Sequence, residues 1–594
     1  MDKSNAENLV STAFNYPFDQ SKYSELISNI FKNTISINEI SNDEPDFKDF
    51  VEKINIYCEY TDDNGKKIHA IEVVVNEKIN FDKSRSLQRN FAIYYLKKNN
   101  CDSILISFYN KLSEDWRFSL VTREVEATLN KGKIKVNITT SASKKLSYLV
   151  GKNEPNFTAK NQILNLITNN KNNLEDIKNA FSVERVTDDF FKDYKELYQT
   201  LKNEIDTLRK KDKKIGKDFE KNQIKSENFA KKTLGQIVFL FFLQKKGWLG
   251  VERNQNNNFK KWGSGSKTFI SELYSRYSDK KIKGTNFYND VLEPIFYDAL
   301  NNPEDFYEKL DCKMPFLNGG LFEPINGYNW YETDILIKDK TIKKILDIFN
   351  QYNFTVTEDQ PLDREVAVDP EMLGKVFEKL LNEKDRKKGG AHYTPREVVQ
   401  YMCRKSIYYF LKKKLHENLL QEEFDLFIFL IENMDKKLIE EFKSRDIYKH
   451  LNKIDILLEN IKICDPAIGS GAFPVSMMLE IVNIRNFICK LNNKEVDIYE
   501  LKRNFIENNL YGVDIDTGAV DIAKLRLWLS LIVDEKSFEK INPLPNLDYK
   551  IMQGNSLVEK IYDIDFSYQK QSSLLEISND ELSSNLFNLL DKYY

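Results

Sequence analysis

The first 150 residues alternate between apolar runs and polar breaks in a pattern that predicts strands around one helix. Four runs are rich in β-branched or aromatic side chains, as is typical of strands, and a fifth segment has apolar residues at helical spacing. The strand-like runs are residues 54–60, 68–75, 103–108 and 116–121, and the helical segment is 84–98, with Leu87, Phe91 and Tyr94 at that spacing. Residues 1–150 are therefore predicted to form an α/β domain.

Beyond this region the pattern changes to long helical periods and then to an alternation of helices and strands. Residues 183–208 and 228–244 predict long helices, and the second stops just before Gly247, as a helix C-terminus often does. From Asp369 onwards, helix, strand and turn signals alternate, which is typical of a doubly wound parallel sheet. We therefore expect a helical connector over 151–365 and an α/β domain over 366–594.

Composition places the chain among ordinary folded proteins. Its 594 residues are too many for one core, and 41% hydrophobic with 30% charged residues is the balance of a soluble protein. The strongest apolar run, residues 237–243, is far shorter than the ~20 residues that a membrane span needs, and residues 1–7 carry no export signal. We expect a cytoplasmic protein with no membrane partner.

Charge and metal-binding side chains exclude further classes. A formal net charge of −3 argues against a chain coated all round for nucleic acid. A local basic groove stays possible, because affinity for DNA follows the Lys and Arg side chains that meet phosphates. Six cysteines without paired spacing and four histidines support neither a zinc site nor a disulfide framework.

One segment has the composition of a cofactor-binding turn. A short apolar strand ends at Asp465, and a turn then opens a helix. The turn contains Pro466, Ala467, Gly469 and Gly471. Glycines there let a ligand approach the backbone, and the free amides of the new helix offer donors. The third glycine of Gly-x-Gly-x-x-Gly is missing and the next acidic strand end lies far downstream, so NAD binding is disfavoured, although the turn alone could be purely structural.

A second strand end carries a carboxylate that suits a ribose. The short strand 511–514 ends at Asp514, at the edge where open α/β sheets bind ligands, and its carboxylate can accept from both ribose hydroxyls. The competing interpretation is an N-cap for the helix 519–533. Asp516 fits that capping role better, so we assign Asp514 to the ribose and leave Asp516 mainly structural.

A third strand is predicted over 549–552, with Asn555 just beyond its end. The amide oxygen of Asn555 can accept from an adenine amino group. A turn stabilised by Gly554 and Asn555 explains the same residues equally well.

Upstream, residues 389–395 read Gly-Gly-Ala-His-Tyr-Thr-Pro and precede a helix that begins near Arg396. Thr394 is placed to cap this helix and Pro395 to occupy its first position. The preceding basic side chains are Lys384, Arg386, Lys387 and Lys388. They could meet DNA phosphates, although a solvated loop is the simpler account.

In this order, the four motifs resemble the AdoMet-binding half of the γ-class N6-adenine DNA methyltransferases. The resemblance implies that Tyr393, Thr394 and Pro395 contact the methionine end of AdoMet. It places the rest of the cofactor site at Asp465, Pro466, Ala467, Gly469, Gly471, Asp514 and Asn555. Asn-Pro-Pro-Tyr, the catalytic motif expected next, does not occur before Tyr594. We therefore expect an incomplete doubly wound methyltransferase sheet and assign no catalytic residue.

Other segments resemble the large Type IIG restriction-modification proteins, which fuse a nuclease-like domain, a helical connector, a methyltransferase and a target-recognition domain. The segments are 87–91, 115–120, 247–250 and 316–322. A nuclease of the Asp…Glu-x-Lys type needs two carboxylates for Mg²⁺ and a lysine. Asp63 and Glu72 could be the carboxylates, but position 74 is Val. We expect a degenerate domain that does not cleave DNA, with Mg²⁺ bound only if the domain is active.

The resemblance implies site-specific adenine-N6 methylation of double-stranded DNA, with the adenine flipped out of the duplex. Because the catalytic motif and the recognition domain are absent, we expect a chain that binds AdoMet and methylates DNA only when a second chain or a C-terminal extension supplies the rest. Two alternatives stay open. One is an inactive AdoMet-binding or scaffolding remnant, and the other is methylation of RNA or protein.

Overall fold

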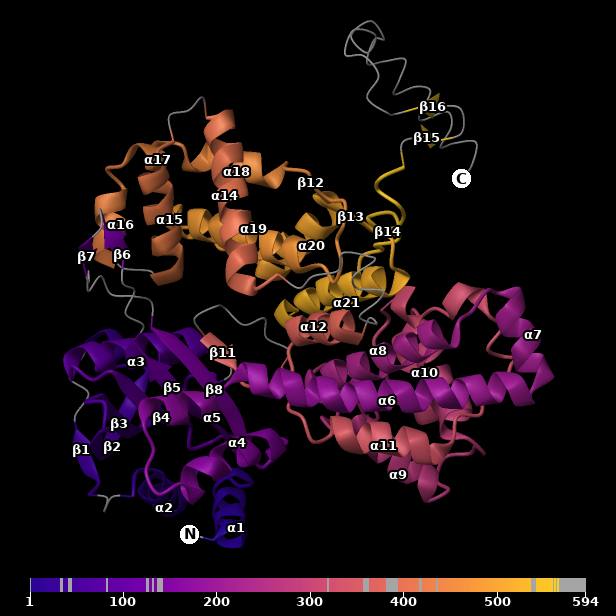
Figure 1. The fold of residues 1–594 in the computed structure, drawn as a ribbon, viewed down its shortest axis with the longest axis horizontal. Helices are drawn as coiled ribbons and strands as arrows, with labels where there is room; N and C mark the ends of the chain where they lie inside the picture. The colour runs from indigo at the N-terminus through magenta and orange to yellow at the C-terminus, as the bar shows by residue number, and fades with distance from the viewer. Residues whose placement is uncertain are drawn as a thin grey trace, which may run out of the picture.

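The computed structural model describes residues 2–565 apart from 33–35, 41–44, 82–83, 124–127, 131–132, 136–142, 318–319, 356–362, 381–393, 416–418, 434–435, 536–540, 559 and 562–563. The described residues form an N-terminal region around a seven-stranded sheet, a helical region, and a C-terminal region with a three-stranded parallel sheet (Figure 1). The predicted α/β class is confirmed by this mixture of helices and sheets.

The N-terminal sheet has the strand order β1-β2-β3-β4-β5-β8-β11. β3 pairs in parallel with β4 and β8 with β11, whereas the other neighbours are antiparallel. The elements of this region are α1 (Lys3–Phe14), α2 (Gln20–Phe31), β1 (Asn38–Ile40), β2 (Val51–Thr61), β3 (Lys67–Val75), α3 (Arg85–Lys98), β4 (Ser103–Tyr109), β5 (Asp115–Thr122), β6 (Thr128–Asn130), β7 (Lys133–Lys135), β8 (Lys144–Gly151), α4 (Phe157–Thr168) and α5 (Leu174–Ala180). The four strands and the helix predicted for residues 54–121 are all present.

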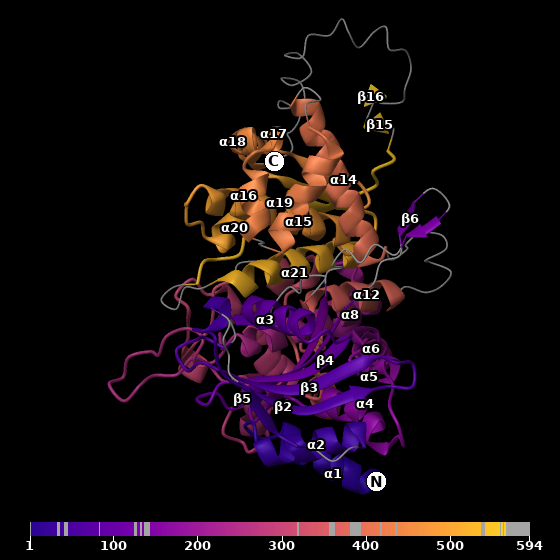
Figure 2. The same cartoon turned by 90° about the vertical axis from the view of Figure 1, so that its left-hand side faces the viewer.

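Helices cover both faces of this sheet, which explains the continuous apolar run of β3. Ile68 and Ala70 pack in the core that includes α1, α2 and α4, while Ile71 and Val73 pack in a second core with Phe91 of α3. Figure 2 shows α1 and α2 on one side of the strands and α3 on the other. A strand buried on both faces reads as unbroken hydrophobic sequence instead of alternating.

The helical region contains the two long helices that the sequence predicts. α8 is buried on every side over its second half, as its unbroken apolar composition requires. It ends at Lys245, directly before Gly247, whose φ of 71° terminates the helix. The elements are α6 (Val183–Lys211), α7 (Lys213–Lys221), α8 (Ser226–Lys245), α9 (Phe269–Ser278), α10 (Glu293–Tyr297), β9 (Phe306–Tyr307), β10 (Cys312–Lys313) and α11 (Asp339–Phe349).

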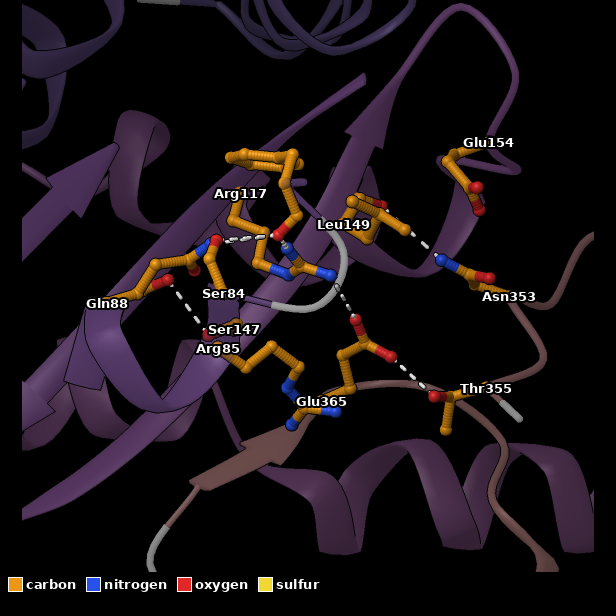
Figure 3. Close-up of polar contacts among 12 residues, drawn as sticks. Ser84, Arg85, Gln88, Arg117, Ser147, Leu149, Glu154, Asn353, Thr355 and Glu365 are labelled. Atoms are coloured by element: carbon orange, nitrogen blue, oxygen red, sulfur yellow. Dashed lines mark hydrogen bonds and ion pairs between the residues drawn. The ribbon is translucent and has the colours of Figure 1, made fainter. Parts of the chain in front are cut away.

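The end of the expected connector returns to the N-terminal sheet, a pairing that the sequence did not predict. β11 (Asp363–Glu365) pairs in parallel with β8, placing Asp363 beside Lys145. Buried charges hold it there, because Asp363 Oδ1 lies 3.3 Å from Lys145 Nζ, and Glu365 accepts from the Thr355 hydroxyl at 2.5 Å and pairs with Arg117 at 3.7 Å (Figure 3). The expected boundary at residue 365 therefore falls at the end of an N-terminal sheet strand.

The C-terminal region alternates helices with three parallel strands in the order β12-β13-β14. α12 and α21 lie between this region and the helices α6 and α8 (Figures 1 and 2). The elements are α12 (Pro370–Leu380), α14 (Arg396–Lys414), α15 (Gln421–Asn433), α16 (Lys436–Phe442), α17 (Asp446–Lys449), α18 (Leu451–Glu459), β12 (Ile463–Asp465), α19 (Ala472–Leu491), α20 (Ile498–Asn508), β13 (Leu510–Asp514), α21 (Thr517–Asp534), β14 (Ile551–Gln553), β15 (Lys560–Ile561) and β16 (Ile564–Asp565).

Among the described helices, α19 alone has the length and apolar composition that would allow it to cross a membrane. It packs against α14, α18 and α20. Its Glu480 forms an ion pair with Arg404 of α14 at 2.9 Å. These contacts are those of a core helix, which passes the same test of length and composition.

Candidate functional site

The carboxyl ends of β12, β13 and β14 meet at one edge of the C-terminal sheet. The parallel register places Asp465 beside Gly512 and Asp514 beside Gln553. Parallel strands bring the loops that follow them to the same edge, which is where open α/β folds bind ligands. The structure therefore brings together the predicted turn after Asp465, the predicted strand end at Asp514 and the segment around Asn555.

The turn after β12 requires glycine at two positions. Gly469 and Gly471 have φ values of 52° and 80°, in the left-handed region that other residues rarely adopt. A Cβ on Gly471 would also lie 3.2 Å from the Cα and Cβ atoms of Ala523 in α21. The Ile468 amide donates to the Val513 carbonyl at 3.0 Å in the neighbouring strand. The turn is thus held against both β13 and α21.

Asp514 joins the glycine turn to the segment that leads into α21. Its Oδ2 accepts from the Gly469 amide at 2.8 Å, and its Oδ1 accepts from the Asp516 amide at 2.9 Å. An ionised carboxylate has about four acceptor positions, so a half-buried Asp514 can still accept from ribose hydroxyls. Asp516 accepts from the Gly518 amide at 2.8 Å at the N-cap of α21, which confirms its predicted capping role.

Asp465 occupies a less polar position at the same edge. Its Oδ1 accepts from the Ala467 amide at 3.1 Å. Burial raises the pKa of the Asp465 carboxyl, the hydrogen bond from Ala467 opposes the rise, and the negative charge of Asp514 adds to it. Two carboxylates at one edge give it an excess of negative charge that a cationic ligand would relieve.

The loop after β14 closes the third side of the site. The Ser556 hydroxyl donates to the Pro466 carbonyl at 2.5 Å, a link between loops that no sequence motif indicated. Asn555 is exposed, and its Oδ1 accepts from the Leu557 amide at 3.0 Å. The side chain therefore forms the local turn that was the alternative interpretation, and its contact with an adenine stays a prediction.

The loop predicted to close over the cofactor is described only at its end. Tyr393 and the four basic residues at 384–388 lie outside the described residues. Thr394 and Pro395 are described, and α14 begins at Arg396. Pro395 is itself the N-cap residue, with φ −54° and ψ 143° and no side-chain capping bond. The predicted cap by Thr394, with Pro395 as first helical residue, is therefore wrong by one position, because the extended Pro395 delays the helix.

The structure does not bring Asp63 and Glu72 together. Asp63 lies in the exposed turn after β2 and forms an ion pair with Lys171. Glu72 lies within β3 with its side chain buried, directly opposite Asn55 of β2. In the part of the chain that is described, no group of three or more His, Cys, Asp or Glu side chains could hold a metal ion.

Neutral donors surround the Glu72 carboxylate. Its Oε2 accepts from the Tyr57 hydroxyl at 2.5 Å and from Asn55 Nδ2 at 3.2 Å, and its Oε1 accepts from the Tyr109 hydroxyl at 3.0 Å. A buried carboxylate that is hydrogen-bonded in this way needs no cation to remain stable. Val74, where a nuclease would have lysine, is buried in the same strand. The arrangement is that of a structural carboxylate.

Residues 440–564 match a protein family described as the MmeI DNA-methyltransferase domain. The matched range contains Asp465, the glycine turn, Asp514 and Asn555. A protein of Methanocaldococcus jannaschii named "Putative type II restriction enzyme and methyltransferase" is 31% identical over 421 residues, which are 65% of this chain and 33% of that protein. DNA methyltransferase A of Bacillus subtilis is 24% identical over 248 residues, which are 42% of this chain and 23% of that protein.

Two solved structures are also similar to the chain. The Type IIL restriction-modification enzyme MmeI in complex with DNA has a TM-score of 0.38 and 17% identity, over 61% of this chain and 40% of that one. The DrdV–DNA complex has a TM-score of 0.24 and 12% identity, over 88% of this chain and 36% of that one. The chain spans 33% and 23% of the length of the two curated relatives. The family matches identify the chain as the carrier of an MmeI-type DNA-methyltransferase domain and as a homologue of type II restriction enzyme and methyltransferase proteins.

Proposed function

We propose that the protein binds AdoMet at the edge formed by β12, β13 and β14, as the cofactor-binding part of a site-specific DNA adenine-N6 methyltransferase in a restriction-modification system. The observation that carries the proposal is the pair of hydrogen bonds through which Asp514 joins Gly469 to Asp516. These bonds fix the carboxylate relative to the glycine turn before a ligand arrives. Preorganisation of this kind improves affinity because less ordering is needed on binding.

The residues at this edge fit the chemistry of AdoMet. Asp514 would accept from the ribose hydroxyls, and Gly469 and Gly471 leave one side of the turn without side chains. Asp465 would attract the positively charged methionine end. To contact an adenine, Asn555 would exchange its hydrogen bond with Leu557 for one with the base. AdoMet supplies an activated methyl group when bound, and the contribution of this chain is to hold and orient it.

We propose double-stranded DNA as the partner and the adenine amino nitrogen as the methyl acceptor. The order of the four motifs supports the choice of adenine, and the match of residues 440–564 to a DNA-methyltransferase domain supports the choice of DNA. The sequence contains no Asn-Pro-Pro-Tyr. We therefore propose that transfer requires a polypeptide that carries this motif and a recognition domain, as a second chain or as an extension.

The missing motif also favours a second candidate, an AdoMet-binding or scaffolding protein without turnover. An assay with methyl-labelled AdoMet and unmethylated DNA separates the two. We would test the chain alone and with the corresponding C-terminal segment of the Methanocaldococcus jannaschii relative. N6-methyladenine formed only in the mixture supports the proposal, and binding of AdoMet without methylation in either sample favours the scaffold. Transfer by the chain alone contradicts the need for a second polypeptide.

A further inference from the structure

The helix α12 connects the two loops that are proposed to enclose AdoMet, so any role of this helix in binding rests on the proposed function. α12 packs against α21 on one side and against α6 on another (Figures 1 and 2). Its N-terminus is fixed by Asp369, whose Oδ1 accepts from the Met372 amide at 2.6 Å. Neither Asp369 nor any other residue of this segment belonged to a sequence motif for the cofactor.

On one side, α12 holds the first turn of α14. Glu371 Oε2 lies 3.0 Å from Arg396 Nη1, and Arg396 is the residue that follows Thr394 and Pro395. The next residue, Glu397, pairs with Arg364 of β11 at 3.5 Å. Two ion pairs from the segment 364–371 therefore fix the start of α14, directly after the loop that is proposed to contact the methionine end of AdoMet.

On the other side, α12 supports the glycine turn. A Cβ on Gly374 would lie 3.0 Å from Ser470 Oγ and 3.1 Å from Arg526 Nη1, so glycine permits this close approach. Arg526 of α21 donates from Nη1 to the Ser470 carbonyl at 2.9 Å. Because Ser470 lies between Gly469 and Gly471, these contacts fix the middle of the turn.

The charge of Glu371 links the two sides. Burial would raise the pKa of this carboxyl, but Arg396, Lys375, Arg526 and Arg364 lower it to about 2. Glu371 is therefore ionised at every working pH. The carboxylate offsets the repulsion among the surrounding guanidinium and ammonium groups, which would otherwise face one another in a poorly solvated space.

We propose that Glu371 is a positioning residue for AdoMet: through Arg396 and Arg526 it sets the position of the first turn of α14 relative to the glycine turn. Glu371 acts on the cofactor through these two arginines, since its described contacts are with protein. Loss of its charge lets the two loops move apart, which weakens binding of a ligand that needs both of them.

The test uses calorimetric titration of AdoMet into the full chain with Glu371→Gln, Arg396→Gln, Arg396→Lys and the double variant Glu371→Gln/Arg396→Gln. We expect Glu371→Gln and Arg396→Gln each to raise the Kd about tenfold, within the range of roughly 5- to 150-fold that is typical of coupled contacts. The double variant should be no weaker than either single one, since both remove the same link. Arg396→Lys keeps the charge and should retain most of the affinity.

Lys379→Gln is the matched control for a general loosening of α12. Lys379 lies on the same helix and forms an ion pair with Asp188 of α6 at 2.7 Å, away from both loops. It should lower the melting temperature slightly and leave the Kd unchanged. If the wild type binds and Glu371→Gln binds equally well, or if Lys379→Gln weakens binding as much, the positioning role is overturned. A wild type that does not bind AdoMet overturns the proposed function, and the positioning role with it.

Discussion

The Oδ2 atom of Asp514 lies 2.8 Å from the backbone nitrogen of Gly469, so the last residue of β13 is hydrogen-bonded to the first left-handed glycine after β12. The two strands are parallel neighbours, and this bond fastens the turn of one to the end of the other. A hydrogen bond to a charged group contributes about 1.5–3 kcal/mol. The relationship makes the turn and the carboxylate a single unit, on which the predictions for the cofactor site depend.

Gly471→Ala should destabilise the glycine turn and weaken AdoMet binding. A non-glycine residue at its φ of 80° is strained by about 1–2 kcal/mol, and the new Cβ would press on Ala523 in addition. Gly65→Ala is the matched control, because Gly65 has a φ of 75° but no atom would lie within 4 Å of its new Cβ. Differential scanning calorimetry should show the larger loss for Gly471→Ala. Equal losses would contradict the close packing of the turn on α21.

Asp465 should make AdoMet binding dependent on pH. Because burial raises its pKa above the ordinary 3.8, Asp465 takes up a proton at a higher pH than an exposed aspartate does. The neutral carboxyl no longer attracts a cationic ligand, so the affinity of the wild type should fall as the pH is lowered toward this raised pKa. Asp465→Asn should bind more weakly and show a flatter profile between about pH 5 and pH 8. Parallel profiles for the two proteins would exclude this role.

Lys145 should give the N-terminal region a stability that rises at alkaline pH. Burial lowers the pKa of Lys145 from 10.5 to about 8, and Asp363 opposes the decrease. An unfolded chain keeps the ordinary pKa, so between these values it binds more protons than the folded chain, and stability increases with pH in that window. Lys145→Met should remove this increase in the melting temperature. A wild type and a variant with the same pH dependence would refute the assignment.

Mg²⁺ should leave the stability of the N-terminal region unchanged. Glu72 is already satisfied by Tyr57, Asn55 and Tyr109, and Asp63 is engaged with Lys171 at a different part of the sheet. Adding Mg²⁺ or EDTA is therefore expected to shift the melting temperature by less than about 1 °C, since a ligand that does not bind the folded state cannot stabilise it. A Mg²⁺-dependent increase that Glu72→Gln abolishes would contradict this account.

The sequence was sufficient to predict the elements that have strong local signals. Asp514 was identifiable because a short apolar run ends at a carboxylate, and Asp516 because it stands directly before a helix. The strand β3 was predicted because burial on both faces leaves an unbroken apolar run. In each of these cases the residue's role follows from its immediate neighbours in the chain.

Relations between distant segments were not predictable in the same way. Asn55 faces Glu72 through strand register, and two irregularities in the β2–β3 pairing shift that register beyond what residue counting reveals. β11 has three residues, too few for a periodic signal, and its position depends on buried charges of Lys145 and Arg117. The pairing of Glu371 with Arg396 likewise becomes visible only once α12 and α14 are packed.

The most direct test of the central claim is calorimetric titration of AdoMet into the wild type, Asp514→Asn and Asp516→Ala. Asparagine keeps the shape of Asp514 but loses the charge and one acceptor oxygen, whereas Asp516→Ala removes only a helix cap worth about 1 kcal/mol of stability. We predict saturable binding by the wild type, a roughly ten- to hundredfold higher Kd for Asp514→Asn, and a nearly unchanged Kd for Asp516→Ala. No binding by the wild type, or equal Kd values for all three proteins, would contradict the account.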